Sequence, residues 1–294
     1  MKRILLSLLF VAVAVAIQAQ DAAGVLSLAR RVNDYFVAQN PDPTKPTFVK
    51  KKRTSNLWTR AVYYEGLMDL YSVDPDKRYL EYTDRWGVYH KWTARGSVDD
   101  TNADNQCCEQ TYIDRFAATG DSVMIAPTTE NLNHQMATGR KNYWWWIDAI
   151  QMAMPVYAKY AKISGDRHYL DYAMDCYRDA RDRRGLFNIA DGLWWRDSVY
   201  KAPYKEPDGK NCYWSRGNGW VYAALVRVMK TVDADDPYYK ELLKDYLLMT
   251  HALVKLQRRD GYWNASLVST NYAGPEMTGT ALFLYGMAWG VRNG

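Results

Sequence analysis

Two aspartates stand where a carboxyl group could act as an acid or a base. Asp104 lies in the segment NADNQCCEQ, and Asp148 follows the aromatic run YWWWI. Indole rings partly remove a carboxyl group from water and raise its pKa, which suits general acid catalysis near neutral pH. A first helical turn has the opposite effect, because the helix dipole favours the carboxylate. The sequence leaves open which effect prevails at Asp148, and whether either aspartate is only a capping or ion-paired residue.

A second kind of chemistry is indicated by the segment YWSRGNGW, residues 213–220. Trp214 and Trp220 flank Arg216, and two glycines let the backbone approach a neighbour closely. A guanidinium group held between aromatic rings can bind a carboxylate through two parallel hydrogen bonds. The alternative is a helix N-terminus that carries a surface arginine.

The composition favours a sugar ligand over a nucleic acid. The 294 residues include 12 Trp and 24 Tyr but only 6 Phe, an excess typical of grooves lined by amphipathic rings. A large helical core rich in tyrosine would explain the same excess. The formal net charge is only +5, and no basic cluster is interleaved with aromatic residues, so we expect no nucleic-acid partner. The run KKKR at 50–53 is interpreted as a solvated face.

The first twenty residues predict export. They combine a basic start, a short apolar run and small residues near Ala19, as a signal peptide does, so residues 21–294 form the predicted mature domain. We therefore expect a periplasmic or secreted protein without a membrane anchor. The four cysteines and four histidines show no metal-ligand spacing, and no metal or other cofactor is expected.

Helical periodicity covers almost the whole mature chain. The predicted helices are 21–39, 56–73, 77–94, 104–119, 145–164, 166–182, 214–232, 235–257 and 275–293, with a weaker one at 122–138. Polar turns with an aspartate that can cap the next helix recur at 73–77, 119–121, 164–167 and 233–237. Alternating residues in the insert 185–213 predict a short hairpin. The pattern indicates an all-α protein built as a closed ring of helical hairpins.

Six motifs, in this order, resemble one enzyme family. They are NADNQ, WWWIDAIQMAMP, DGLWWRD, WSRGNGW, DGYWNASL and PEMTGTALFLYGMAWG, and they run from about residue 56 to the end of the chain. The chain is similar to the unsaturated rhamnogalacturonyl hydrolases of glycoside hydrolase family 105. The related unsaturated glucuronyl hydrolases of family 88 match less closely.

This resemblance implies an (α/α)6 barrel of six helical hairpins and a hydrolase of pectin degradation. The implied substrate is a rhamnogalacturonan oligosaccharide that ends in a 4,5-unsaturated galacturonyl residue, and the reaction is hydration of its double bond. Unsaturated glucuronyl ends of glycosaminoglycan or other lyase products, and a sugar-binding relative without activity, are the alternatives. The oligomeric state is left open.

The resemblance also assigns roles to single residues. Asp148 corresponds to the catalytic acid and base, and Asp104 to the second essential acid. Arg216 and Trp220 correspond to residues of the unsaturated-sugar subsite, and Trp214 is placed with them. The remaining substrate-binding candidates are Trp58, Trp146 and Arg196.

The chain departs from the family pattern in three places. Ala103 stands where family 88 enzymes have a histidine before the second acid. The insert has Trp194-Trp195-Arg196-Asp197 where some relatives have a histidine, and Arg196 is the candidate substitute. Ten predicted helices fall short of the twelve that six hairpins need, so we expect the last hairpin to be missing. The apolar faces of helices 21–39 and 275–293 should then be exposed and promote self-association.

Overall fold

The computed structural model describes residues 21–294, and every predicted helix is present in this part of the chain. The α-helices are α2 (Ala22–Gln39), α3 (Trp58–Val73), α4 (Lys77–Tyr89), α5 (Ala103–Gln106), α6 (Glu109–Thr119), α7 (Ala126–Ala137), α8 (Asp148–Ser164), α9 (His168–Arg178), α10 (Ser215–Met229), α11 (Pro237–Leu256) and α12 (Met277–Arg292). The predicted helix 104–119 is divided into the single-turn α5 and the longer α6. The predicted signal peptide lies in residues 1–20, outside the described residues, and stays a prediction.

The predicted capping aspartates act at the turns between hairpins. Asp76 and Asp236 accept hydrogen bonds from the backbone N–H groups of Arg78 and Tyr238, at 2.9 and 2.8 Å. Asp121 caps the 3-10 turn Ser122–Met124 in the same way. Each cap satisfies an N–H group that has no partner inside the helix, so the position of the turn determines where the next helix begins.

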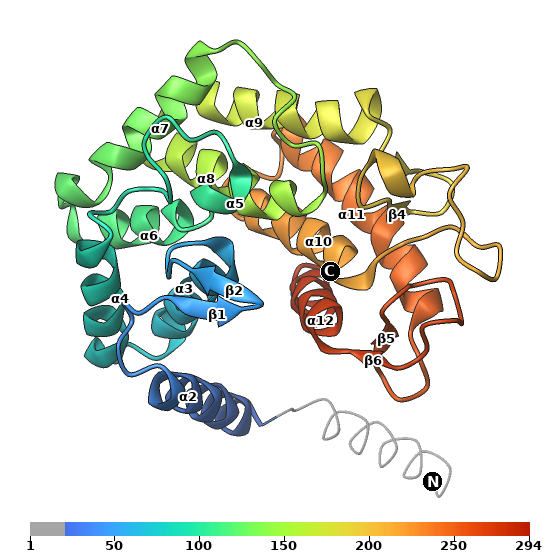
Figure 1. The fold of residues 1–294 in the computed structure, drawn as a ribbon, viewed down its shortest axis with the longest axis horizontal. Coiled ribbons are helices and arrows are strands. Elements are labelled where there is room, and N and C mark those ends of the chain that lie inside the picture. The colour runs from blue at the N-terminus through green and yellow to red at the C-terminus, as the bar shows by residue number, and fades with distance from the viewer. Residues whose placement is uncertain (1–20) are drawn as a thin grey trace, which may run out of the picture.

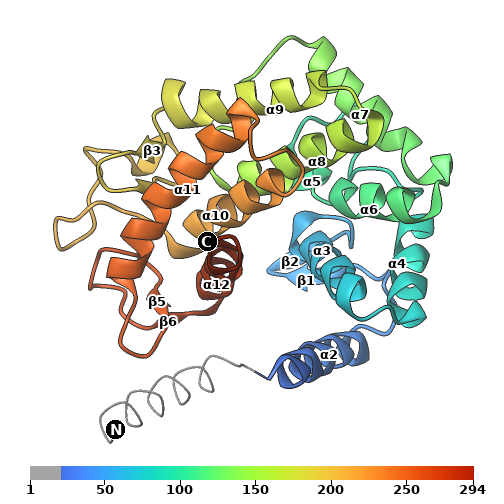
Figure 2. The ribbon, with the colours of Figure 1, turned by 180° about the vertical axis from the view of Figure 1, so that it is seen from behind.

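The helices form two concentric layers (Figures 1 and 2). The inner layer holds α3, α6, α8, α10 and α12, and the outer layer holds α4, α7, α9 and α11, while α2 packs outside α3. Because an outer helix returns the chain after each inner helix, the inner helices run in the same direction. Their N-terminal turns consequently lie at one end of the ring. The all-α barrel of hairpins is confirmed.

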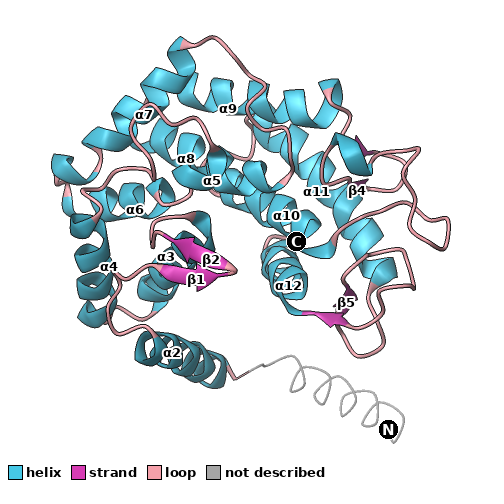
Figure 3. Cartoon of the chain, in the orientation of Figure 1, coloured by secondary structure: helices cyan, strands magenta, loops and turns pink. Residues whose placement is uncertain are grey.

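Three small hairpins accompany the helices (Figure 3). They pair β1 (Thr47–Val49) with β2 (Lys51–Arg53), β3 (Phe187–Asn188) with β4 (Leu193–Trp194), and β5 (Trp263–Asn264) with β6 (Pro275–Glu276). Only the second was predicted, within the insert 185–213. The first turns at Lys50, which has a positive φ of 59°.

The glycines of the segment 213–220 serve helix packing. A Cβ atom on Gly217 would lie 2.8 Å from the side chains of Ile147 and Trp214, and one on Gly219 would lie 3.0 Å from Leu282. On α12, a Cβ atom on Gly279 would lie closer still to Ser215 Oγ of α10. The close approach predicted from these glycines is therefore an approach of α10 to its neighbours in the inner layer.

Exposed apolar side chains lie along both α2 and α12. On α12, Met277, Leu284 and Val291 follow at intervals of seven residues and are 65, 52 and 86% exposed. On α2, the exposed apolar side chains are Val25, Leu28, Val32 and Tyr35. The predicted exposure of these two faces is thus confirmed.

We expect the protein to self-associate through these faces, because exposed apolar stripes of this length favour burial against another surface. Leu284→Lys places a charge in the middle of the stripe on α12 and should lower the weight-average mass in sedimentation at equal concentration. Lys240→Leu, on the outer helix α11, is a control that removes a surface charge elsewhere. An unchanged, monomeric mass for wild type and variants would contradict the expectation.

Candidate active site

Asp148 is the first residue of α8 and is almost buried. Its side chain is 9% exposed, and Oδ2 has no hydrogen-bond partner among the described residues. The chain before it is held in place because the Ile147 N–H group donates to the Arg196 carbonyl at 2.9 Å and Trp146 forms a β-bridge with Asp197. The insert thus positions the start of α8.

Burial is the main cause of a raised pKa at Asp148. Removal from water raises it to about 6, and the negative charge of Asp104 acts in the same direction. Arg196 and Arg216 oppose the shift. Burial is therefore the largest influence on the pKa of Asp148, and the carboxyl group can hold a proton near pH 6.

Asp104 is the second residue of α5 and is not the N-cap. Asn102 has that role, since its side-chain oxygen accepts a hydrogen bond from the Asp104 N–H group at 2.9 Å. The capping interpretation of Asp104 is wrong. Burial raises its pKa to about 6 as well, while Arg53 and Arg196 lower it.

The two carboxyl groups form an electrostatically coupled pair. Each has a pKa near 6, and the charge of Asp104 makes ionisation of Asp148 harder. Such a pair loses its first proton more easily than its second, so one protonated and one ionised carboxyl group coexist near pH 6. The protonated group can donate a proton, and the ionised group can stabilise a developing positive charge.

Two arginines form a cationic wall beside the carboxyl pair. The Arg216 guanidinium lies 4.2 Å from the centre of the Trp214 ring, and its Nε atom is buried without a partner. Arg196 donates to Asp197 and lies 5.9 Å from the Tyr200 ring. The predicted stacking of Arg216 on Trp214 is confirmed, whereas the Trp220 ring contacts Trp58. An arginine with an unused donor beside a pocket is suited to bind a carboxylate.

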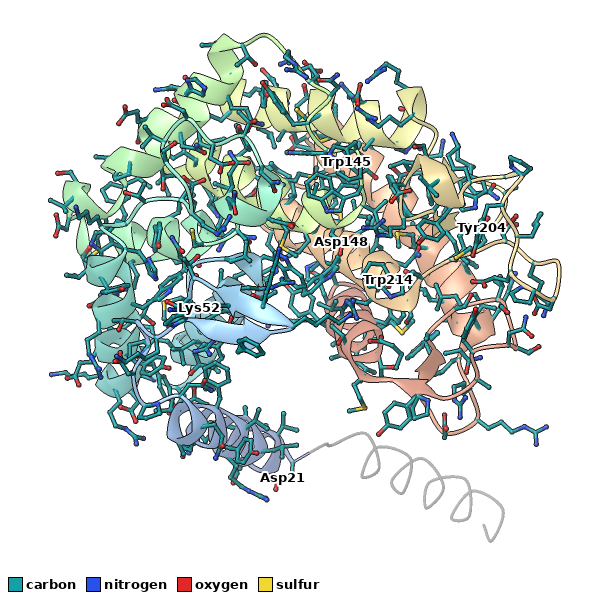
Figure 4. The ribbon with its side chains drawn as sticks, in the orientation of Figure 1. Asp21, Lys52, Trp145, Asp148, Tyr204 and Trp214 are labelled. Carbon is teal, nitrogen blue, oxygen red and sulfur yellow. The ribbon has the colours of Figure 1, made fainter. Side chains whose placement is uncertain are left out.

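The arginines line a pocket of about 470 Å³. Its other lining residues are Tyr200, Glu206, Cys212, Trp214, Ala265, Ser266 and Tyr272. The two acids are not among the lining residues, but Arg196 acts electrostatically on both of them and Arg216 acts on Asp148. Figure 4 shows Asp148 and Trp214 on the inner side of the ring, at the beginnings of α8 and α10.

The remaining predicted aromatic residues lie around this end of the barrel. Trp58 begins α3 and contacts Trp220 of α10 edge to face, with ring centres 6.4 Å apart. Trp146 is 8% exposed and packs against Trp145, which is 51% exposed. Trp58 and Trp220 thus form one wall, whereas Trp146 supports the segment before Asp148. Contact of these rings with substrate stays a prediction.

Arg53 is the site residue that sequence reasoning missed. Lys50, Lys51 and Lys52 are exposed as interpreted, but the β1–β2 hairpin turns Arg53 inward, where its Nε atom is buried without a partner. It lowers the pKa of Asp104 more than Arg196 does. The three residues Thr47–Val49 before the turn were the available signal, because apolar and β-branched residues are typical of a strand.

Three findings concern the described residues as a whole. None of the helices in residues 21–294 is both long and apolar enough to cross a membrane. Within the same residues, no three His, Cys, Asp or Glu side chains are grouped so that they could hold a metal ion. The four cysteines, all within this part of the chain, are unpaired.

Comparison with known proteins relates the chain to carbohydrate enzymes. The family model described as Glycosyl Hydrolase Family 88 matches residues 28–294. An unsaturated 3S-rhamnoglycuronyl hydrolase of Formosa agariphila is 28% identical over 81% of this chain and 67% of its own length. A family 88 glycosyl hydrolase from Bacteroides vulgatus has a solved structure with a TM-score of 0.84 and 32% identity, over 92% of this chain and 79% of that one. A structure described as a polysaccharide lyase gives a TM-score of 0.85 at 30% identity, over 92% of this chain and 78% of that one.

Solved structures of family 105 enzymes are similar to this chain at lower sequence identity. A solved family 105 glycoside hydrolase of C. acetobutylicum is 19% identical with a TM-score of 0.73, over 90% of this chain and 77% of that one. At this identity the likeness shows the fold alone. The six-hairpin glycosidase fold is confirmed. The resemblance at family level is confirmed for family 88, which the motifs matched less closely than family 105. Membership of family 105 stays a prediction.

Proposed function

The chain belongs to glycosyl hydrolase family 88, and from this premise we propose that it hydrates the C4=C5 double bond of a terminal unsaturated uronic acid. Hydration releases the neighbouring sugar. The single observation that carries the proposal is the carboxyl pair Asp104 and Asp148, each with its pKa raised to about 6, next to the cationic wall of Arg196 and Arg216. This arrangement combines a proton donor with receptors for an anionic sugar.

The proposed reaction needs a proton donor and a water molecule. In the substrate the double bond joins C4 to C5, and C5 also bears the ring oxygen, so the group is an enol ether. Asp148 donates its proton to C4, and C5 then gains oxocarbenium character, which the negative charge of Asp104 stabilises. Water adds to C5 as its proton returns to Asp148. The resulting hemiketal opens, and the hemiacetal left at C1 collapses to release the neighbouring sugar as an alcohol.

The neighbouring sugar, not the uronate, should determine substrate preference. Galacturonate and glucuronate differ only in configuration at C4, and the double bond removes that difference. The two unsaturated ends considered from the sequence are therefore the same residue on different neighbours. The name of the curated relatives joins an unsaturated uronyl group to rhamnose. We propose rhamnose as the neighbour, as in rhamnogalacturonan fragments of pectin, with a glucosamine-type neighbour as the alternative.

The sign of an absorbance change tests the reaction. The double bond is conjugated with the carboxylate and absorbs ultraviolet light, so hydration of an unsaturated uronyl-rhamnose disaccharide must lower the absorbance. A lyase, which the similarity to a structure described as a polysaccharide lyase raises as a second candidate, would form the double bond and raise the absorbance of an intact uronate polymer. Binding without either change would indicate a sugar-binding protein.

Arg216→Lys should impair hydration although the positive charge is retained. Lysine offers no planar group to stack on Trp214 and no paired donors for a carboxylate. Loss of a charge-assisted hydrogen bond is worth about 1.5–3 kcal/mol, so kcat/KM should fall by roughly 10- to 150-fold. Steady-state kinetics check this, with Arg178→Lys in the outer layer as the control. Equal constants for Arg216→Lys and wild type would assign Arg216 a structural role only.

A further inference from the structure

A layer of buried polar side chains crosses the inner ring below the carboxyl pair, with Glu65 of α3 at its centre. Glu65 is 2% exposed. Its Oε1 atom accepts hydrogen bonds from Cys107 Sγ at 3.2 Å and Gln110 Nε2 at 3.1 Å. Its Oε2 atom accepts one from Gln151 Nε2 at 3.0 Å and lies 3.6 Å from Arg227 Nη2. Four separate segments of the chain thus meet at one carboxyl group.

Two of these partners lie one turn after the candidate acids. Cys107 follows Asp104 by three residues, and Gln151 follows Asp148 by three residues. Three helical residues correspond to a rise of about 4.5 Å. Glu65 therefore holds the segment that carries Asp104 to the helix that carries Asp148, directly beneath both. It contacts neither acid itself.

The same contact joins the two helices that carry the aromatic wall. Glu65 follows Trp58 by seven residues on α3, and Arg227 follows Trp220 by seven residues on α10. The two helices consequently meet twice, through the tryptophan rings at the site and through the Glu65–Arg227 pair two turns below. Arg227 also lies 3.4 Å from Asp69, one turn further along α3.

Glu65 is best described as an ionised carboxylate. In the structure every partner of its two oxygens is a donor, and a protonated carboxyl group would need Gln110 or Gln151 to turn its amide so that the unpaired Oε1 atom accepts. Burial raises its pKa, whereas Arg227, the Cys107 hydrogen bond and Lys159 oppose the rise. A buried ion pair contributes little net stability compared with apolar side chains of the same volume. Stability alone is therefore a poor reason for a carboxylate at this position.

We propose that Glu65 is a positioning residue, which keeps Asp104 and Asp148 at the separation that proton transfer needs. The proposal rests on the function proposed above. The buried polar layer then has a role in the reaction, because it fixes the positions of the two acids. A small displacement of a reacting group can lower a rate by about 100-fold.

Glu65→Gln is the central test. The variant keeps the shape, and Gln151 has an unpaired Oε1 atom that can accept from the new amide after rotation, so the fold should be retained. We expect kcat for the unsaturated disaccharide to fall about 10- to 100-fold with KM nearly unchanged. We also expect the basic limb of the pH profile to move to lower pH, since Asp104 raises the pKa of Asp148 less when the two are further apart.

Asp245→Asn is the matched control. Asp245 is fully buried, pairs with Arg181 at 2.6 Å and accepts from the Tyr177 hydroxyl at 2.8 Å, but it joins two helices of the outer layer, α11 and α9. Both variants lose one buried carboxylate and should melt at lower temperature. Only Glu65→Gln should change kcat and the pH profile.

The exchange Glu65→Gln with Gln151→Glu is the rescue. It returns one carboxylate to the same contact from the other helix, and kcat should recover to within about threefold of wild type. A folded exchange variant as slow as Glu65→Gln contradicts the proposal. So does a Glu65→Gln variant that melts earlier, as Asp245→Asn does, but keeps the kcat and pH profile of wild type.

If the wild-type protein does not hydrate the disaccharide, the proposed function is contradicted, but the positioning role of Glu65 can still be tested. The role is then read from the Asp148 titration, followed by NMR in protein with labelled aspartate carboxyl carbons and assigned with Asp148→Asn. A pKa of Asp148 that differs between wild type and Glu65→Gln supports positioning, and an unchanged pKa overturns it.

Discussion

Asp148→Asn is expected to reduce hydration of the unsaturated disaccharide by about 10³- to 10⁴-fold. Asparagine keeps the size and part of the hydrogen bonding of the side chain, but it cannot deliver a proton to C4. General acid catalysis contributes about 10²–10⁴-fold, and the upper end applies because one carboxyl group serves both the donation and the activation of water. The loss should appear in kcat measured by ultraviolet absorbance, while KM changes little.

The stability of the same variant provides an independent control. The pKa of Asp148 is about 6 in the folded protein against 3.8 for the free side chain. An acid whose pKa is raised by folding stabilises the folded state below pH 3.8, and this contribution is lost as the pH rises through 6. Ionised Asp148 therefore destabilises the folded protein above pH 6, by an amount of order 2–3 kcal/mol. Asp148→Asn should melt at a higher temperature than wild type at pH 8.

Two results would contradict the assignment of Asp148 as the proton donor. One is a folded variant that keeps more than about a tenth of wild-type activity. The other is a melting temperature at pH 8 that falls in the variant, since this would show that the carboxylate is stabilised by partners in the folded state.

Most of the helical scaffold followed from local rules of sequence. The capping aspartates Asp76 and Asp236 mark the beginnings of α4 and α11 within two residues, because an N-cap acts on the two or three residues that follow it. Both candidate acids were found from their aromatic or helix-start neighbourhood together with the family motifs. Arg216 was paired with Trp214 correctly because the two are neighbours in one short segment.

The features that could not be predicted depend on contacts between distant segments. Arg53 reaches Asp104 only through the β1–β2 hairpin, and a run of four basic residues gives no indication that its last member turns inward. The capping interpretation of Asp104 failed because α5 begins at Ala103, one residue before Asp104, and Asn102 is its N-cap. Propensity could not separate the two, since asparagine and aspartate are about equally good caps.

The raised pKa of Asp148 also depends on contacts between distant segments of the chain. Its two main causes are burial under the insert around Arg196 and the charge of Asp104, 44 positions away in the chain. Sequence could name the opposing effects of burial and helix dipole, but their balance depends on how much water reaches the carboxyl group. That quantity exists only once α5, α8 and the insert are packed together.

Asp104→Asn should lower kcat by about 10²-fold or more and should also change the shape of the pH profile. The variant removes the negative charge that stabilises the cation developing at C5, an effect worth about 10²- to 10³-fold when a single preorganised group is lost. It also removes the charge that raises the pKa of Asp148. Because the protonated form of Asp148 is the active one, activity falls as the pH rises through this pKa. The basic limb should therefore move to lower pH in the variant.

Asn102→Ala separates this electrostatic role from a structural one. Asn102 caps α5, so its replacement should cost about 1 kcal/mol of stability, whereas Asp104→Asn leaves the cap in place and should cost less. The two variants should thus show opposite patterns: a lower melting temperature with a nearly normal kcat for Asn102→Ala, and a nearly normal melting temperature with a low kcat for Asp104→Asn. A basic limb that stays in place or moves to higher pH in Asp104→Asn would mean that the two carboxyl groups do not act as a coupled pair, and Asp148 would then owe its raised pKa to burial alone.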